Sequence, residues 1–338
     1  MNILIDGMGG DFAPYEILKG AVKAAKEIDE TITIIGPENT IIKEIKNLGF
    51  EGNNIKIVDS KEVITNNESP AMAVKKKKDS TIVRGMEMLK DGEGDVFISA
   101  GSTGALLSAG LLKVGRIKGI KRPAIAAFFP KIGKNDTTLL LDCGANVETK
   151  ALYLAQFGIM GSVFISGIKK KVNPEIKLLN IGVEAEKGDD LHKEAYSLLQ
   201  KTNINFTGNI EARDVANTDC DVVVTDGFSG NIFLKSSEGV AISIMKRIIN
   251  QLKNGIFSKV GMLLSVSKLK ELKKEFDYSE EGGAPILGLK GAVLKIHGNS
   301  KEKAVYKAIL KSVDYVKADI TGKIENSILE FNENNGDI

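Results

Sequence analysis

The sequence predicts an α/β fold of three layers, in which a mostly parallel sheet lies between two layers of helices and a helical hairpin protrudes. Short apolar runs alternate with amphipathic helical patterns from the first residue onward, which is typical of parallel strands joined by helices. The chain has 338 residues, of which 43% are hydrophobic and 27% charged, enough for a full core. We therefore expect residues 1–338 to form one large domain.

The apolar and amphipathic runs place the elements in order along the chain. The expected strands are Ile3–Ile5, Ile32–Ile35, Ile55–Val58, Val96–Ser99, Ala124–Phe129, Thr138–Leu141, Lys177–Ile181, Val222–Thr225 and Val293–Ile296. The expected helices are Tyr15–Glu27, Thr40–Leu48, Ser80–Lys90, Gly104–Val114, Lys150–Phe164 and Asp190–Gln200. The hairpin is expected within 238–280, and the polar, acidic residues 325–338 are expected to fray. No apolar run is expected to approach the roughly 18 residues that span a bilayer.

Glycine and small polar residues follow many of these strands. The segments are ILIDGMGGD, FISAGSTGA, LLLDCGANV, LLNIGVEAEKG, VVVTDGFSGN and VLKIHGNS. In open parallel sheets, ligands bind at the carboxyl ends of the strands, and helix N-termini there attract anions. Ordinary turn chemistry would explain any one of these loops. Together they favour a shared anion-binding crevice.

Several enzyme classes lack their motifs in this chain. The first loop does not fit Gly-x-Gly-x-x-Gly, and there is neither a P-loop nor a Gly-x-Ser-x-Gly elbow. The only histidines are His192 and His297, so we expect no metal site. Cys143 and Cys220 are expected to be buried and unreactive, in a reducing compartment. The net charge of +2 favours no nucleic-acid partner.

The segments IDGMGGD, SAGSTGA, LDCGANV, LLNIGVEAEKG, GNIEARD, VVVTDGFSGNIFLK and GGAPILGLKGAVLKIHGNS occur in this order over roughly residues 1–320. Their order resembles the signature blocks of the bacterial acyl-ACP:phosphate acyltransferase family, PlsX. The resemblance implies a fold like that of isopropylmalate dehydrogenase and phosphotransacetylase, and a homodimer. It also implies synthesis of acyl-phosphate from acyl-loaded acyl carrier protein and inorganic phosphate, without a cofactor. A glycerol-3-phosphate acyltransferase would consume the product in phospholipid synthesis.

On this basis we assign roles to residues of the strand exits. Lys187 would neutralise phosphate or the oxyanion, although it could instead be a solvated loop lysine. Asn231 would donate from its side-chain amide, or cap its helix. His297 would protonate the leaving thiol, or brace its loop. The residues expected to line the phosphate and substrate site are Asp6, Gly9, Gly10, Asp11, Gly101, Ser102, Thr103, Gly104, Asp142, Asn146, Asp226, Ser229 and Gly230. Of these, Asp142, Asn146 and Asp226 are expected mainly to fix loop geometry.

The predicted hairpin is rich in lysine and arginine and carries a bunched apolar tip. A basic amphipathic element of this kind binds an anionic lipid interface, although its apolar stripe could also pack against the dimer partner. The residues expected to contact the membrane are Ile256, Phe257, Val260, Leu263 and Leu264. We therefore expect a cytoplasmic enzyme that is peripherally associated with the inner face of the cell membrane.

A second basic run, Lys75 to Lys78, is either a solvated face or a docking patch for the acidic carrier protein. Two competing functions remain. One is an NAD-dependent decarboxylating dehydrogenase on a related fold, which would need a carboxylate cluster for a metal and a ribose-binding acid. The other is a non-catalytic lipid-surface scaffold that recruits carrier protein, which would not need the polar strand exits.

Overall fold

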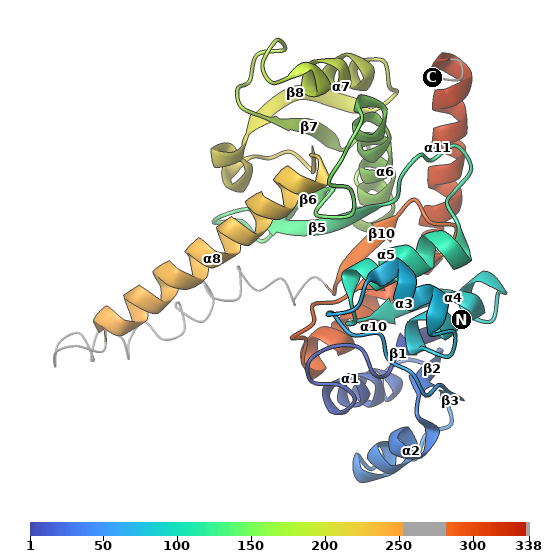
Figure 1. Cartoon of the computed structure of the whole chain (residues 1–338). Coiled ribbons are helices and arrows are strands. Elements are labelled where there is room, and N and C mark those ends of the chain that lie inside the picture. Colours follow the sequence, from blue (N-terminus) through green and yellow to red (C-terminus); the bar gives the residue numbers. More distant parts are fainter. Residues whose placement is uncertain (253–281, 336–338) are drawn as a thin grey trace.

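The computed structural model describes residues 1–252 and 282–335, and its described part is built on one mixed sheet (Figure 1). The strand order in this sheet is β3-β2-β1-β4-β11-β10-β5-β6-β9-β7-β8. The strands are β1 (Asn2–Asp6), β2 (Thr31–Gly36), β3 (Ile55–Asp59), β4 (Val96–Ser99), β5 (Ala124–Pro130), β6 (Thr137–Leu141), β7 (Glu175–Asn180), β8 (Asn205–Glu211), β9 (Val222–Val224), β10 (Ala284–Leu287) and β11 (Ala292–Lys295).

The α/β class with a mostly parallel sheet is confirmed. The helices are α1 (Tyr15–Ala25), α2 (Glu38–Asn47), α3 (Pro70–Lys76), α4 (Thr81–Lys90), α5 (Thr103–Ala109), α6 (Ala151–Lys169), α7 (Asp190–Gln200), α8 (Gly227–Leu252), α10 (Glu302–Lys317) and α11 (Ile320–Asn335). A π-helical turn, Gly110–Val114, continues α5, and a 3₁₀ helix, Ala212–Asn217, follows β8. The expected helices and strands did not include α3, α10, α11, β8 or β10. β8 is a polar strand at one end of the sheet, and β10 has only four residues.

Both faces of the sheet are buried, as the three-layer prediction requires. Successive residues of β1 show this, because Ile3 and Ile5 join one hydrophobic cluster while Leu4 joins the other. Helices α1, α6, α10 and α11 contribute side chains to the first cluster, and α3, α4 and α5 to the second. A strand with alternate residues in two cores must be apolar throughout, which explains the continuous apolar runs of the sequence.

The sheet reverses direction between its two halves. Strands β3, β2, β1, β4 and β11 are parallel to one another, and so are β6, β9, β7 and β8. Between these groups, β10 pairs antiparallel with β11 and with β5, and β5 pairs antiparallel with β6. The carboxyl ends of the two groups therefore do not share one edge, as they would in a fully parallel sheet.

Helix α6 corrects one expectation from the sequence. Its 19 residues are long and apolar enough to cross a membrane by length and composition, so a run of that size does exist. However, 61% of its apolar window is buried inside the protein. Phe157 and Met160 are completely buried in the core beneath the sheet. Its hydrophobicity is explained by packing, as in the central helix of an α/β core.

The expected frayed tail is also wrong for most of its length. Helix α11 continues to Asn335, with Ile324, Ile328 and Phe331 buried at spacings of four and three residues. It packs against α6. The acidic and asparagine-rich residues of this segment face outward from an amphipathic helix, and we misread its polarity as disorder.

Helix α8 leaves the upper half of the molecule and projects away from the body (Figure 1). It is one continuous helix from Gly227 to Leu252, and it includes the first part of the hairpin expected at 238–280. The expected membrane contacts Ile256, Phe257, Val260, Leu263 and Leu264 lie outside the described residues.

Candidate active site

The strand exits of the first half form a cluster around the buried carboxylate of Asp6. Ser99 Oγ donates to Asp6 Oδ2 at 2.7 Å, and Ser99 Oγ also accepts from the amide of Gly101 at 3.0 Å. The amide of Met8 donates to Asp6 Oδ1 at 3.1 Å. Burial raises the pKa of Asp6 above its ordinary value, and these hydrogen bonds oppose the shift. The carboxylate thus ties the ends of β1 and β4 together.

Glycine allows the two loops of this cluster to touch. A Cβ on Gly9 would lie 2.6 Å from the amide nitrogen of Gly101, so only glycine permits the approach. Gly10 has a positive φ of 98°, which favours glycine. The amide of Asp11 then donates to Gly298 O at 2.7 Å, which brings in the exit of β11.

Ser102 is the N-cap of α5, and its Oγ accepts from the amide of Ala105 at 3.5 Å. The first amides of a helix have no partner inside it. In the described part of the chain, the amides of Thr103 and Gly104 also lack an acceptor outside the helix. Within the described residues, Thr103 and Gly104 therefore leave free amide donors, whereas the amide of Gly101 is bonded to Ser99 and the hydroxyl of Ser102 caps the helix.

Lys295, at the end of β11, belongs to this cluster, although it is not among the residues expected from the sequence. Its Nζ donates to the backbone oxygen of Ala100 at 3.2 Å and to that of Ile296. Burial lowers the pKa of Lys295 to about 8, against the opposing charges of Asp6 and Asp11. It is a partly buried cation beside the Gly101 loop. The signal was a lysine closing an apolar strand, within the quoted segment VLKIHGNS.

The exits of the second half cluster around Asp142, at the end of β6. Its Oδ1 accepts from the amides of Ile125 and Ala145, at 2.9 and 3.1 Å. Its Oδ2 accepts from the backbone and the side-chain nitrogen of Asn146, at 2.8 and 3.0 Å. Asn146 Nδ2 also donates to Pro123 O at 2.8 Å. These bonds agree with the loop-fixing role expected of both residues, and burial raises the pKa of Asp142.

Asp226 and Gly230 connect this loop to α8. Asp226 Oδ1 accepts from the amides of Phe228 and Ser229, at 3.0 and 2.8 Å, and so caps the helix. The close approach of Gly230 to the backbone of Asp142 leaves no space for a side chain. Asn231 lies in the first turn with its side chain beside Gly144. Asp226 is the cap, and Asn231 remains available for another role.

Lys187 lies on the loop after β7 and is exposed. The backbone at Lys187 is held in place, because Asn180 Nδ2 donates to Lys187 O at 3.0 Å. Its Cγ lies 2.8 Å from the position that a Cβ on Gly182 would take. Among the described residues, its ammonium group has no hydrogen bond or ion pair, and the structure records no contact between it and Asn231.

A largely apolar pocket of about 620 Å³ lies between this loop and the first turns of α8. Its lining includes Leu179, Asn180, Ile181, Gly188, Asp189, His192, Ala212, Phe228, Ser229, Ile232, Phe233, Ser236 and Ser237. Gly188 and Asn180 adjoin Lys187, and Ile232 adjoins Asn231. The pocket therefore opens beside both candidate catalytic residues.

The strand exits thus form two clusters, and one side chain of α8 interacts electrostatically with residues of both. Glu238 on α8 is half-buried, which raises its pKa, and electrostatic interactions with His297 and Lys235 oppose this shift. The charge of Glu238 also acts on Cys143, next to Asp142. Glu238 is therefore near both the exit of β11 and the exit of β6.

Neither cysteine is equipped as a nucleophile. Both thiols are buried, and burial raises the pKa of Cys143 well above its ordinary value and that of Cys220 to about 11. Within residues 1–252 and 282–335, no group of three or more histidine, cysteine or acidic side chains could hold a metal ion.

Comparison with known proteins gives consistent relatives over the whole chain. Residues 1–323 match the family model described as "Fatty acid synthesis protein". A phosphate acyltransferase of Clostridium acetobutylicum is 45% identical over 333 residues, which cover 98% of this chain and 100% of that protein. A phosphate acyltransferase of Thermoanaerobacterium thermosaccharolyticum is 45% identical over 328 residues, 97% of each chain.

Solved structures with a similar fold are more distant in sequence. A phosphotransacetylase from Streptococcus pyogenes matches with a TM-score of 0.64 at 16% identity, over 94% of each chain. A 4-hydroxythreonine-4-phosphate dehydrogenase from Klebsiella pneumoniae matches with a TM-score of 0.53 at 13% identity, over 94% of this chain and 99% of that one. At these identities the likeness concerns the fold alone, and the fold serves both transacylases and dehydrogenases.

Proposed function

The chain belongs to the fatty acid synthesis protein family and is a phosphate acyltransferase, and we propose that its acyl donor is the thioester of acyl carrier protein. The observation that carries the activity is the 45% identity to phosphate acyltransferases along almost the whole chain. This finding sets aside the competing dehydrogenase and scaffold hypotheses. The geometry of the site indicates which residues of the chain would take part in each step of the reaction.

In the proposed reaction, a phosphate oxygen attacks the carbonyl carbon of the thioester. The carbon–sulfur bond then breaks, and the carrier protein leaves as a thiolate that takes up a proton. Phosphate is itself the nucleophile, so no activated cysteine or serine is needed. Holding it close to the carbonyl carbon, above the plane of the thioester, can lower the barrier by about 7–11 kcal/mol.

The free amides of Thr103 and Gly104 and the ammonium group of Lys295 support a phosphate site at the first cluster. Backbone amides that point to one place bind anions, and a partly buried cation adds charge where water screens it little. Lys187 and Asn231 would act at the carbonyl oxygen, where one donor typically supplies about 3–4 kcal/mol. His297 would protonate the leaving thiolate.

The apolar pocket of about 620 Å³ is the proposed site of the acyl chain. Its size falls in the range of roughly 300–1,000 Å³ that ligand pockets occupy. Phe228 and Ile232 lie at its wall and remain about half exposed, at 56% and 50%. An acyl chain would cover them and place its carbonyl carbon near Asn231.

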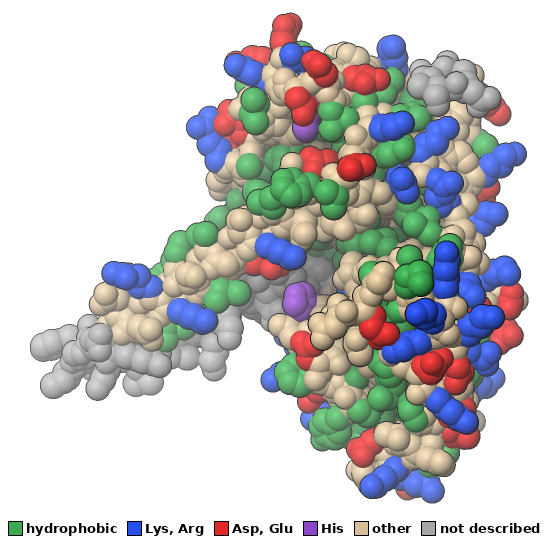
Figure 2. Space-filling model, viewed as in Figure 1, with side chains coloured by type: hydrophobic (Ala, Val, Ile, Leu, Met, Phe, Trp, Pro, Cys, Tyr) green, Lys and Arg blue, Asp and Glu red, His purple; other side chains and the backbone are tan. Residues whose placement is uncertain are grey.

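The apolar face of α8 supports a homodimer. Val240, Ile244 and Ile248 recur every four residues and are exposed on one side of the projecting helix, and Figure 2 shows hydrophobic side chains along it. We propose that a second copy covers part of this face, that the enzyme is cytoplasmic, and that its hairpin tip contacts anionic lipid. The released acyl-phosphate would then pass to a glycerol-3-phosphate acyltransferase.

Incubation with palmitoyl-acyl carrier protein, with and without inorganic phosphate, tests the reaction. We expect phosphate-dependent release of free carrier protein, seen by mass spectrometry, and an acyl-hydroxamate when hydroxylamine traps the acyl-phosphate. Lys187→Ala should lower kcat by about 10²–10³-fold while the circular dichroism spectrum is unchanged, because the side chain is exposed. An intact thioester in the wild-type reaction would exclude the carrier protein as donor.

A further inference from the structure

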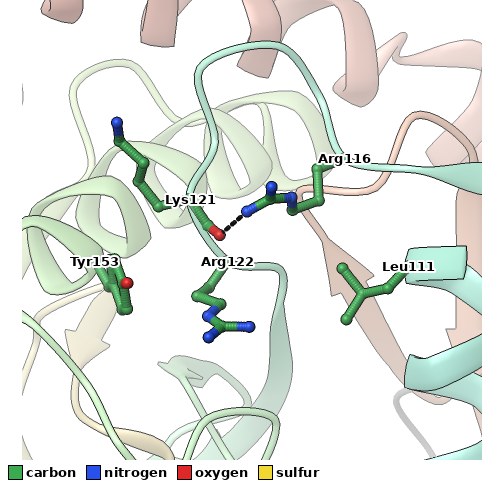
Figure 3. A pocket seen from close by; sticks show the side chains of 5 residues that line it. All are labelled: Leu111, Arg116, Lys121, Arg122 and Tyr153. Atoms are coloured by element: carbon green, nitrogen blue, oxygen red, sulfur yellow. Dashed lines mark hydrogen bonds between the residues drawn. The ribbon is translucent and has the colours of Figure 1, made fainter. Parts of the chain in front are cut away.

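A basic pocket of about 470 Å³ lies away from the apolar one, and no role assigned so far uses it. It is lined by Leu111, Arg116, Lys121, Arg122 and Tyr153 (Figure 3). Leu111 comes from the π-helical turn after α5, and Tyr153 from the first turn of α6. The three cations come from the loop that joins these elements before β5.

The positive charge of this pocket is uncompensated in the described part of the chain. The guanidinium group of Arg116 donates to the backbone oxygen of Lys121, but it meets no carboxylate there. The side chains of Lys121 and Arg122 have neither a hydrogen bond nor an ion pair among the described residues. All three are exposed. In a chain with a net charge of +2, three unpaired cations around one hollow form a local positive field.

The loop that carries these cations is held firmly. The amide of Lys121 donates to Gln156 Oε1 at 2.9 Å, and Gln156 Nε2 donates to Gly119 O at 2.9 Å. Gln156 is completely buried. The amide of Ile117 donates to Gly288 O at 3.0 Å, which ties the loop to the sheet. A fixed backbone presents the charges with little loss of entropy on binding.

The pocket adjoins the second cluster of the active site. Arg122 directly precedes Pro123, whose oxygen accepts from Asn146 Nδ2 at 2.8 Å. Asn146 in turn binds Asp142. A partner bound in the pocket would therefore touch the rim of the site where the thioester must arrive.

The arrangement of the cations suits an extended acidic surface better than one small anion. In Figure 3 the side chain of Lys121 runs away from that of Arg122, which points between Tyr153 and Leu111. A single phosphate would need these groups to converge within hydrogen-bond reach. Diverging, exposed cations match carboxylates spread over a protein surface.

The other basic run is less suited. Lys77 is paired with Glu68 at 2.8 Å and with the oxygen of Val63 at 2.7 Å, so the run Lys75 to Lys78 is partly neutralised. We propose that the pocket of Arg116, Lys121 and Arg122 is the docking surface for the acidic carrier protein that delivers the acyl thioester. This inference rests on the proposed function, since it needs acyl carrier protein as the donor.

The test is steady-state kinetics of the full-length enzyme, with Arg116→Ala, Lys121→Ala, Arg122→Ala and the triple variant. An exposed ion pair contributes about 0.2–1 kcal/mol, so each replacement should raise KM for acyl carrier protein by about 1.5- to 5-fold. The triple variant should raise it by about 3- to 100-fold, with kcat and KM for phosphate unchanged. Lys118→Ala is the matched control, because Lys118 is an exposed cation of the same loop that does not line the pocket.

Measurements at different ionic strengths and with lipid vesicles distinguish a carrier-protein surface from a phosphate site and from a lipid site. Raising ionic strength should increase KM for acyl carrier protein in the wild type and much less in the triple variant. An increase in KM for phosphate alone would make this a phosphate site and overturn the inference. Weaker binding of the triple variant to phosphatidylglycerol vesicles, with an unchanged KM for carrier protein, would also overturn the inference. If the wild type itself leaves the thioester intact, the proposed function fails, whereas equal KM values for wild type and variants reject the docking surface alone.

Discussion

Replacing Lys295 tests whether the first cluster holds phosphate through a buried cation. The lysine keeps its proton in the folded protein only up to a pH of about 8, because burial removes water from the ammonium group. In the unfolded chain the same group stays protonated to its ordinary pKa of 10.5. Below pH 8 both states are protonated, and the cost of burying the charge is fully present. Between pH 8 and 10.5 the unfolded state binds more protons, so this residue's contribution to stability rises with pH.

The size of this effect follows from the two pKa values. The difference between about 8 and 10.5 corresponds to about 3 kcal/mol. Urea unfolding of the wild type and of Lys295→Met at several pH values isolates it, since other titrating groups cancel in the comparison. The stability of the wild type relative to the variant should rise by about 3 kcal/mol from pH 7 to pH 10.5. A difference that stays constant with pH would show that Lys295 has an ordinary pKa.

Activity gives the second readout. In the wild type, kcat/KM for phosphate should fall above pH 8 as Lys295 loses its proton, because kcat/KM follows the ionisation of the free enzyme. Lys295→Arg should move this fall to higher pH, because arginine stays charged. Lys295→Met should lower kcat/KM for phosphate at pH 7 and lose the fall near pH 8. Unchanged kcat/KM for phosphate in Lys295→Met would refute a phosphate-binding role.

Three further changes test the second cluster, the apolar pocket and the C-terminal helix. Asp142→Ala should lower the free energy of urea unfolding by at least about 4 kcal/mol, because four donors lose their acceptor; a loss below 1 kcal/mol would contradict this. Ile232→Trp should reduce kcat/KM for palmitoyl- relative to octanoyl-acyl carrier protein, by about 4-fold for each methylene displaced, while the remote control Val172→Trp should not. Ile328→Ala should destabilise the protein by about 2–5 kcal/mol in thermal unfolding, whereas a frayed end would give almost no change.

Periodicity predicted most of the fold. The strands with alternate residues in two cores read as continuous apolar runs, and α7 begins and ends at the predicted residues, Asp190 and Gln200. The misses have physical causes. β8 is a polar edge strand, and β10 is too short to show a pattern. Helix α11 is marked by only a few apolar residues, such as Ile328, within a polar segment.

Side-chain roles were harder to predict than loop positions. The expected exits are all at strand ends, and Asp142 and Asn146 fix their loop as expected. Ser102 and Asp226 cap helices. The sequence alone does not distinguish a helix cap from a ligand-binding residue, because both uses need the same side-chain oxygen. Lys295 closes an apolar strand, but the groups that surround it, such as Ala100 and Asp6, come from distant parts of the chain, so the sequence did not show its burial.

The reversal in the sheet bears on the proposed reaction, because it separates the residues that we propose to act in it. A wholly parallel sheet would have gathered every strand exit at one edge, and no further element would be required. Here three antiparallel pairings separate the exits into two clusters, one with Lys295 and one with Asn231. Helix α8 starts inside the second cluster and carries Glu238 close to His297 of the first. In the proposed reaction, phosphate at one cluster would meet a thioester at the other, so the direction in which α8 leaves β9 would matter, and Gly230 packs on the backbone of Asp142 at that point.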